Sequence, residues 1–360
     1  MSNPKRLDPS VKSIYALLLS LLACHASLAE QATPLRIVAF NCEVLKAPGV
    51  RQGQFDRYRF DPARIAHHER VAAVIETLSP DIIGLEEVIS RESVDMLLGI
   101  LHDKGMTDYR GYHVENSDTY SGMDVCYITR LKPDVVEGEK IRTINSEAED
   151  PTWRAWYSAP GYNGESPRRQ STSVSRNAVY YFTVAGHKLG FLGLHLKSNP
   201  SDEAANSKRM AESIVAQRIL QSEIVRRGYE PIVMGDLNDY DAEVADGDDS
   251  RDTVTKVIRN LKDFDPKRPG DELINAAALI PRKQDRYSSN WDFNENGFDD
   301  PGDVHTMIDH ILFAKDLKPF VNRAFISHCT PHDTSDHFPV VLDLLLPPVS
   351  NGTVVRGAGG

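Results

Sequence analysis

Cysteine is scarce in this sequence of 360 residues, which contains only four, at positions 24, 42, 126 and 329. Three of them would remain after removal of the N-terminal leader described below. An odd number of cysteines at wide spacing is not a disulfide framework. Cys42 and Cys126 lie in or beside hydrophobic runs, so we expect them to be small buried side chains.

Basic charge is in deficit, because 41 lysines and arginines face 52 aspartates and glutamates, which gives a formal net charge of −11. A protein that relied on bulk attraction to nucleic acid would usually be basic. A polyanionic substrate would therefore need local basic patches or bound metal cations. The composition is otherwise that of an ordinary globular protein, with 41% hydrophobic and 26% charged residues.

Long apolar runs are absent after the N-terminus, so no later segment is expected to span a membrane. Residues 1–29 fit a secretory signal peptide, because basic residues precede the apolar run 14–23 and small residues at 27 and 29 suit cleavage. We therefore expect a secreted or periplasmic protein. An alternative is a lipoprotein anchored through Cys24, because residues 21–24 resemble a lipobox.

Strand-like and helix-like segments alternate along the chain. Hydrophobic runs predict strands at 35–41, 81–85, 125–129, 178–184, 189–196, around 232, and at 308–313 and 340–345. Helical spacing predicts helices at 62–78, 94–101 and 202–227. Hairpin-like connections interrupt the alternation, so a mixed-sheet sandwich flanked by helices fits better than a doubly wound parallel sheet. One catalytic domain at 34–347, with a disordered tail at 348–360, is the simplest organisation; 151–176 stays unassigned.

Polar side chains end several of the predicted strands. A carboxylate such as Glu87 suits a hard cation that prefers oxygen ligands, such as Mg²⁺. Asp236 and Asn238 share one side of an extended segment because strand side chains alternate. Asp309 and His337 suggest an imidazole oriented by a carboxylate. Each of these features alone would more often be a turn or a core residue, and only their occurrence together favours a site for phosphate-ester hydrolysis.

The ordered motifs closely resemble the endonuclease/exonuclease/phosphatase superfamily over nearly the whole chain after the leader. They comprise VAFN at 38–41, DIIGLEEV at 81–88, GLHLKS at 193–198, GDLN at 235–238, MIDH at 307–310 and SDH at 335–337. The resemblance implies a four-layer α/β sandwich, in which two packed mixed β-sheets are flanked by helices. One departure is Glu86, which stands where the family often has glutamine.

The resemblance also implies a role for each polar residue. Asn41 and Glu87 would hold Mg²⁺ or Mn²⁺, with Asp336 nearby. Asp236 would orient or deprotonate the attacking water, and Asn238 would bind the scissile phosphate.

The remaining roles belong to basic side chains. By the same resemblance His337, held by Asp309, would contact or protonate the phosphate. His195 matches a second catalytic histidine of the deoxyribonuclease-like branch, and Arg176 matches a phosphate-contacting arginine of that branch.

A loop near the C-terminus has the spacing of a calcium site. Oxygen-bearing side chains occupy positions 1, 3, 5, 9 and 12 of an EF-hand-type loop, with glycine at position 6. These side chains are Asp292, Asn294, Asn296, Asp300 and Asp303. Structural Ca²⁺ is one interpretation, and a polar surface loop without a cation is the other.

The segment 151–176 combines aromatic and basic residues, among them Trp153, Trp156, Arg168 and Arg169. Nucleic-acid bases would stack on the aromatic rings while phosphates meet arginine. Contact with a membrane interface and packing under a loop are the alternatives.

The chain is expected to be a secreted, divalent-metal-dependent phosphodiester hydrolase, foremost a nuclease that cleaves DNA or RNA by in-line attack of water. We expect it to act as a monomer without a stable protein partner, with nucleic acid as its substrate. One alternative keeps the chemistry and makes the substrate a lipid, as in sphingomyelinases, or a phosphomonoester. The other is a catalytically inactive binding module on the same fold, against which the intact motif set argues.

Overall fold

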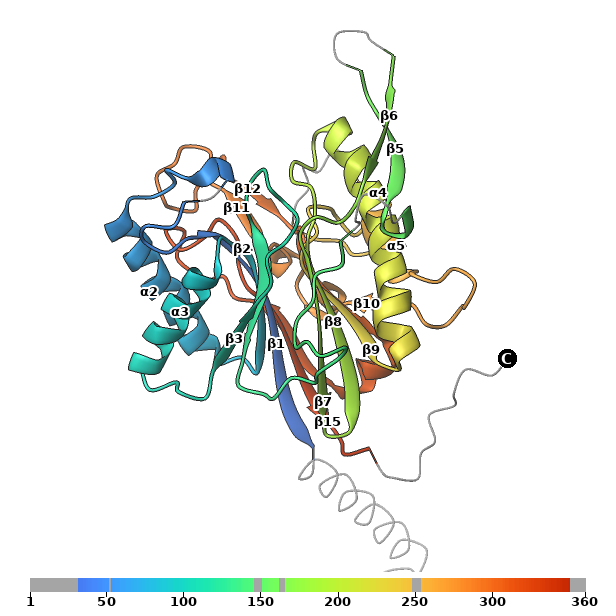
Figure 1. Ribbon diagram of the computed structural model, residues 1–360, viewed down its shortest axis with the longest axis horizontal. Helices are drawn as coiled ribbons and strands as arrows, with labels where there is room; N and C mark the ends of the chain where they lie inside the picture. The colour runs from blue at the N-terminus through green and yellow to red at the C-terminus, as the bar shows by residue number, and fades with distance from the viewer. Residues whose placement is uncertain (1–31, 52, 146–150, 162–165, 248–253, 350–360) are drawn as a thin grey trace, which may run out of the picture.

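The computed structural model describes residues 32–51, 53–145, 151–161, 166–247 and 254–349. The predicted signal peptide, with Cys24, and residues 350–360 of the predicted tail lie outside the described residues. The predicted fold class is confirmed, because two mixed β-sheets pack face to face and helices cover their outer faces (Figure 1). The result is a four-layer α/β sandwich.

The first sheet has six strands in the order β14-β15-β1-β2-β4-β3. Their bounds are Thr33–Leu45 (β1), Ile82–Val88 (β2), Arg110–His113 (β3), Asp124–Thr129 (β4), Val321–Ile326 (β14) and Val340–Leu346 (β15). Only β1 and β2 pair in parallel within this sheet. Ile37 and Ala39 pack between the sheets, whereas Val38 and Phe40 pack beneath the helices. Because both faces of β1 are buried, its sequence is a continuous apolar run.

The second sheet has five strands in the order β10-β13-β9-β8-β7. Their bounds are Asn177–Val184 (β7), His187–His195 (β8), Glu230–Asp236 (β9), Leu273–Asn275 (β10) and Asp309–Ala314 (β13). The pair β8 and β9 is parallel, and the other pairs are antiparallel. The predicted hairpin between β7 and β8 is confirmed, with Ala185 and Gly186 in its turn at φ 51° and 89°.

Helices α2 (Asp61–Leu78) and α3 (Arg91–Asp103) cover the first sheet, while α4 (Glu203–Ile219) and α5 (Val257–Lys262) cover the second (Figure 1). The predicted helix at 202–227 is confirmed, but its last part changes to a π-helical turn, Leu220–Ile224, and a 3-10 turn, Val225–Arg227. None of the helices in the described ranges is both long and apolar enough to cross a membrane.

Two short ribbons stand outside the two large sheets. The first consists of β5 (Ala155–Ala159) and β6 (Arg168–Thr172) and projects beyond α4 in Figure 1. Both of its strands lie within the segment 151–176, which the sequence left unassigned. The second consists of β11 (Ser289–Trp291) and β12 (Val304–Thr306) and carries the predicted calcium loop. Further 3-10 turns lie at Gly53–Phe55, Pro151–Trp153, Ala276–Leu279, Lys283–Asp285 and Lys315–Phe320.

The thiols of Cys42 and Cys126 are free and fully buried, as predicted, and both lie in strands of the first sheet. Cys329 is exposed and also free. No disulfide therefore contributes to the stability of the described part of the chain.

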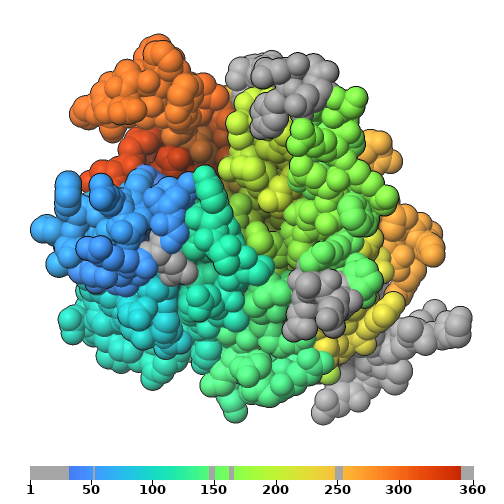
Figure 2. Space-filling view, turned by 45° about the horizontal axis from the view of Figure 1, so that its top comes forward, coloured from blue at the N-terminus to red at the C-terminus, as the bar shows by residue number. Residues whose placement is uncertain are grey.

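The carboxyl ends of the parallel strands meet at one edge of the sandwich. In β1 this end carries Asn41, in β2 Glu87, in β8 His195 and in β9 Asp236. The first residue of the antiparallel strand β13, Asp309, lies at the same edge because it pairs with Asp236. Figure 2 shows this end of the molecule, which is hollowed between the blue and teal, the orange and red, and the yellow-green segments. Ligands of open α/β sheets bind at the carboxyl ends of strands.

Gly235 allows the two sheets to approach each other beneath this edge. Its φ is +125°, and a Cβ atom there would lie 2.2 Å from the carbonyl oxygen of Leu194 and 2.7 Å from Oε1 of Glu86. Only glycine adopts this backbone conformation without strain. Close packing and the backbone conformation therefore require glycine at position 235, just before Asp236.

Replacing Gly235 with alanine should lower the free energy of unfolding by about 3 kcal/mol or more, since backbone strain and overpacking add. Urea unfolding followed by circular dichroism measures the loss. Gly99 is the matched control, because it lies in α3 with no atom within 4 Å of a new Cβ. Gly99→Ala should stabilise by up to about 1 kcal/mol. Equal stability of both variants would contradict the packing argument.

Candidate active site

Asp236 lies at the centre of the polar cluster. It stands opposite Asp309 on one neighbouring strand and opposite His195 on the other. Asn41 donates from Nδ2 to Asp236 Oδ2 at 3.1 Å and to Glu87 Oε1 at 3.2 Å. This one amide therefore joins the first sheet to the second at their common edge.

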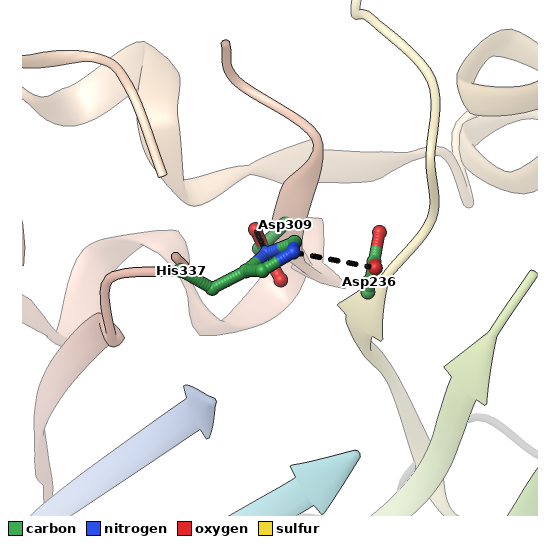
Figure 3. A group of neighbouring side chains, drawn as sticks. All are labelled: Asp236, Asp309 and His337. Atoms are coloured by element: carbon green, nitrogen blue, oxygen red, sulfur yellow. Dashed lines mark hydrogen bonds and ion pairs between the residues drawn. The ribbon is translucent and has the colours of Figure 1, made fainter. Parts of the chain in front are cut away.

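His337 and Asp309 form a hydrogen-bonded pair, as the sequence predicted. His337 Nδ1 lies 2.8 Å from Asp309 Oδ2, and His337 Nε2 lies 4.0 Å from Asp236 Oδ2 (Figure 3). Asp336 Oδ1 is 3.8 Å from the same Nε2. Burial lowers the pKa of His337, but Asp309, Asp336 and Asp236 outweigh it and raise the pKa well above the ordinary value. The imidazole is therefore protonated at neutral pH and can donate a proton from Nε2.

Two serines that the sequence analysis did not single out hold this pair in place. Ser288 Oγ donates to Asp309 Oδ2 at 2.8 Å and accepts the backbone N–H of Asp309 at 2.8 Å. Ser335 Oγ donates to the carbonyl oxygen of Asn41 at 2.8 Å and accepts the N–H of His337 at 3.0 Å. For Ser335 the SDH motif carried a signal, whereas nothing in the sequence around Ser288 distinguishes it.

Asn238 lies directly beside Asp236. Its backbone N–H donates to Asp236 Oδ1 at 3.0 Å, and its φ of +50° lies in the left-handed region that asparagine tolerates. Its Nδ2 donates to the carbonyl oxygen of Leu196 at 3.3 Å. The local turn thus fixes Asp236 Oδ1, while Asp236 Oδ2 accepts the hydrogen bond from Asn41.

His195 faces the same carboxylates from the other side. Its Nε2 lies 3.6 Å from Asp236 Oδ2 and 3.7 Å from Glu87 Oε1. Arg176 Nη1 lies 3.2 Å from both ring nitrogens, and Arg176 Nη2 donates to the Leu196 carbonyl at 3.0 Å. Burial and the Arg176 cation hold the pKa of His195 well below its ordinary value. This second imidazole is therefore neutral, in contrast to His337.

The buried carboxylates repel one another. Burial and the nearby Asp309 raise the pKa of Asp236 to about 7. Burial and Asp336 raise the pKa of Glu87. Glu86 is fully buried, neither of its carboxylate oxygens has a hydrogen-bond partner, and burial and Asp309 raise its pKa well above the ordinary value. This shift favours the neutral form of Glu86, the form in which this departure from the family pattern adds no charge.

The predicted metal ligands fit a divalent cation. Glu87, Asp336 and Asn41 all offer oxygen, the donor type that Mg²⁺ prefers. The Asn41 Oδ1 atom accepts the N–H of Glu43 at 3.1 Å, and an amide oxygen has a second lone pair for a cation. A cation would also relieve the desolvation and repulsion that raise the pKa of Glu87.

A second grouping of ligand atoms is tighter. Atoms of Asp236, Asp309 and His337 lie within 4.8 Å of one another. Asp309 Oδ2 engages His337 Nδ1 at 2.8 Å, which leaves Nε2 as the nitrogen that can hold a cation or donate a proton. The acids around His337 raise its pKa well above the ordinary value, which favours proton donation from Nε2.

The predicted calcium ligands come together in the loop between β11 and β12. Asp292 Oδ2 accepts the N–H of Gly297 at 2.6 Å, and Asp303 Oδ1 accepts the N–H of Phe293 at 3.1 Å. The side-chain amides of Asn294 and Asn296 donate to Asp300. The amide nitrogens of Asn294 and Asn296 thus contact Asp300, while Asp292 and Asp303 bind backbone N–H groups of the same loop.

The base of this ribbon contacts the active site. Asn290 N–H donates to the carbonyl oxygen of Asp336 at 2.9 Å, and Ser289 forms a β-bridge with His337. Ser288, which holds Asp309, immediately precedes β11. These contacts link the base of the calcium loop directly to Asp309 and His337.

Four of the candidate site residues, Glu87, Arg176, His195 and Asp336, line a groove of about 530 Å³. Its acidic lining residues are Glu43, Glu87, Asp118, Glu212 and Asp336, and its basic ones are Arg176, Lys197, Lys208 and the neutral His195. The excess of carboxylates suits a metal cation, and the arginine and lysines suit an anionic substrate.

Comparisons with known proteins agree with this fold. The sequence profile of the Endonuclease/Exonuclease/phosphatase family matches residues 39–337. The chain is similar to a 3′ phosphatase, NExo, from Neisseria bound to a product DNA hairpin, at 14% identity and a TM-score of 0.55 over 86% of this chain and 99% of that chain. A search of curated proteins found no match.

Two further solved structures are similar. A family protein from Leptotrichia buccalis has 17% identity and a TM-score of 0.52, over 86% of this chain and 98% of that chain. TDP2 from Caenorhabditis elegans has 14% identity and a TM-score of 0.51, over 87% of this chain and 74% of that chain. At these identities the likeness concerns the fold.

Fold and site together define a two-sheet α/β phosphoester hydrolase. Because the profile match spans most of the sequence, the chain belongs to the endonuclease/exonuclease/phosphatase family. Enzymes of this family hydrolyse phosphoester bonds with a divalent metal, and a cluster of carboxylates and histidine lies at the edge of this sandwich.

Replacing Asp309 with asparagine should lower kcat about 10²- to 10⁴-fold, because His337 loses the carboxylate that orients it and keeps it protonated. Hydrolysis of bis(p-nitrophenyl) phosphate measures the loss, and thermal unfolding verifies the fold. Asp343→Asn is the matched control, because Asp343 pairs with Arg36 and Arg323 away from the cluster. The control should lose stability and keep kcat. Full turnover by Asp309→Asn would contradict the role of the pair.

Proposed function

We propose that the protein is a divalent-metal-dependent phosphodiesterase that cleaves nucleic acid by in-line attack of water. The observation that carries the proposal is the position of Asp236. Its two oxygens are fixed by Asn41 and Asn238, and it lies between a protonated and a neutral histidine. Phosphoryl transfer to water requires a proton acceptor and a proton donor near the reacting phosphate, and Asp236 and His337 can fill these two roles.

The proposed chemistry divides among these side chains. Arg176 and Asn238 bind the non-bridging oxygens of the scissile phosphate, and Asp236 accepts a proton from the attacking water. The new P–O bond forms as the bond to the leaving oxygen breaks, and His337 Nε2 supplies the proton for that leaving oxygen. When bound by Glu87, Asp336 and Asn41, a Mg²⁺ or Mn²⁺ ion would neutralise charge on the phosphate.

A lipid phosphodiester is the second candidate substrate. Trp156 on the projecting β5–β6 ribbon is 60% exposed, which suits contact with a membrane interface. The Arg169 guanidinium, however, lies over the Trp156 ring, 4.4 Å from the ring centre, and most of β6 is exposed and polar. The ribbon therefore favours a polyanion. The intact cluster around Asp236 argues against an inactive binding module. The N-terminal sequence supports secretion as part of this proposal.

Asp236→Asn should reduce turnover by at least about 10³-fold and leave the fold intact, because it removes the proton acceptor and keeps the side-chain volume. The activity assay should include plasmid DNA, RNA, sphingomyelin vesicles and a chromogenic phosphodiester. Each is tested with Mg²⁺, with Mn²⁺, and after chelation. Chelation should abolish hydrolysis, and added Mg²⁺ or Mn²⁺ should restore it.

Two results would contradict the proposal. Retained turnover in Asp236→Asn would show that Asp236 is not the proton acceptor. Hydrolysis of sphingomyelin without cleavage of DNA or RNA would show that the substrate is a lipid phosphodiester and not a nucleic acid.

We also propose that the loop of residues 292–303 binds a structural Ca²⁺ ion. The EF-hand-type spacing of its oxygen-bearing side chains supports this. In that case Ca²⁺ at 100-fold above its Kd should stabilise the protein by about 2.7 kcal/mol. Asp292→Asn and Asp303→Asn should each remove most of this gain, because each removes a charged ligand.

Thermal unfolding with and without Ca²⁺ measures the effect. Asp299→Asn is the matched control, because it makes the same charge change in the same loop at a position outside the ligand spacing. Equal Ca²⁺ stabilisation of all three variants would reject the site.

A further inference from the structure

A second pocket of about 620 Å³ lies beside the active-site groove, between the β5–β6 ribbon and the start of α4. The ribbon contributes Tyr157, Arg168 and Gln170 to its lining. Lys197 and Lys208 line this pocket and the active-site groove alike. The two spaces therefore adjoin across these lysines.

The charge changes sign between the two spaces. The active-site groove is predominantly acidic, as described above, whereas the second pocket carries Arg168, Lys197 and Lys208 and the single acid Asp202. Asp202 caps α4 and accepts the N–H of Ala205 at 2.6 Å. This carboxylate, and with it the start of the helix, is already engaged. Among the described lining residues, a ligand of the second pocket thus meets three cations and one carboxylate.

Glu212 and Arg209 hold the backbone of Lys197 in place, and the Lys208 ammonium lies 3.8 Å from Glu212 Oε1. The N–H of Lys197 donates to Glu212 Oε2 at 2.9 Å, and Arg209 Nη1 donates to the Lys197 carbonyl at 2.7 Å. Burial, Arg176 and Lys208 lower the pKa of Lys197, which reflects the crowding of positive charge there. Such crowding favours an anionic ligand.

The ribbon presents a polar face to this pocket. Tyr157 pairs with Gln170, and its hydroxyl donates to Gln170 Oε1 at 2.8 Å, while Ala159 pairs with Arg168. Because side chains alternate along a strand, Trp156 and Arg169 lie on the opposite face. Any contact of Trp156 with a membrane would therefore use the face that points away from the pocket.

We propose that this pocket is a phosphate subsite that binds a second phosphate of the same nucleic-acid strand, beyond the phosphate that is cleaved. This proposal rests on the proposed nuclease function and specifies its substrate as a strand of several nucleotides. Lysine and arginine are the side chains that bind backbone phosphates. A substrate with a single phosphate group would occupy the active-site groove alone.

The test compares substrates of different length. For wild-type protein with Mg²⁺, kcat/KM should be higher for a hexanucleotide than for a dinucleotide. Arg168→Gln should lower the ratio of these two values about tenfold, the loss expected for one charge-assisted contact. The slope of log kcat/KM against log salt concentration should become shallower by about one for the hexanucleotide.

Two variants serve as controls. Arg168→Lys keeps the charge and should retain most of the length dependence. Arg226→Gln removes one exposed cation from the far end of the α4 segment and should leave the length dependence and the salt slope unchanged. These controls separate the subsite from a general change in net charge.

Each other outcome has one meaning. If wild-type protein and Arg168→Gln show the same length dependence and salt slope, the subsite is wrong and the nuclease function stands. If wild-type protein cleaves no nucleic acid, the proposed function fails and the subsite fails with it. If Arg168→Gln impairs hydrolysis of sphingomyelin vesicles but not of oligonucleotides, the pocket serves a lipid surface and the proposal is overturned.

Discussion

The burial of several carboxylates at one edge of the sandwich is the constraint on which the rest of the site depends. Asp236, Asp309 and Glu86 are buried at this edge, and Glu87 lies partly exposed beside them. Buried carboxylates are stable only when they are hydrogen-bonded, protonated or paired with a cation. Asn41 supplies hydrogen bonds, the raised pKa of Glu86 favours its neutral form, and His337 is the cation. The remaining excess of negative charge is what a divalent metal would balance.

The fold determines where these groups meet. Each sheet contains one parallel pair, and the carboxyl ends of both pairs lie at the same edge. Gly235 lets the sheets approach there, and the left-handed φ angles of Glu87 (61°) and Asn238 (50°) occur at the strand ends that carry the site. Backbone of this kind costs free energy and persists only where surrounding packing fixes it. The stability of the sandwich therefore maintains the arrangement of the cluster.

Much of this was predictable from sequence because buried strands such as β1, β8 and β9 are continuous apolar runs that end in polar residues. Strand β14 was missed because most of its side chains are at least partly exposed, so it lacks such a run. The β5–β6 ribbon was missed because polar residues dominate its second strand. Ser288 was missed because its contact with Asp309 depends on tertiary structure. Long-range hydrogen bonds leave no local pattern in a sequence.

The division of charge along the groove explains how an acidic protein can act on a polyanion. A net charge of −11 gives no general attraction to nucleic acid. The carboxylates are concentrated where a metal would neutralise them, and Lys197 and Lys208 follow directly beside them. Since screening limits exposed charges to about 10 Å at 0.1 M salt, these nearby cations determine binding more than the distant acids do. In the proposed function, local arrangement rather than net charge sets the preference for substrate.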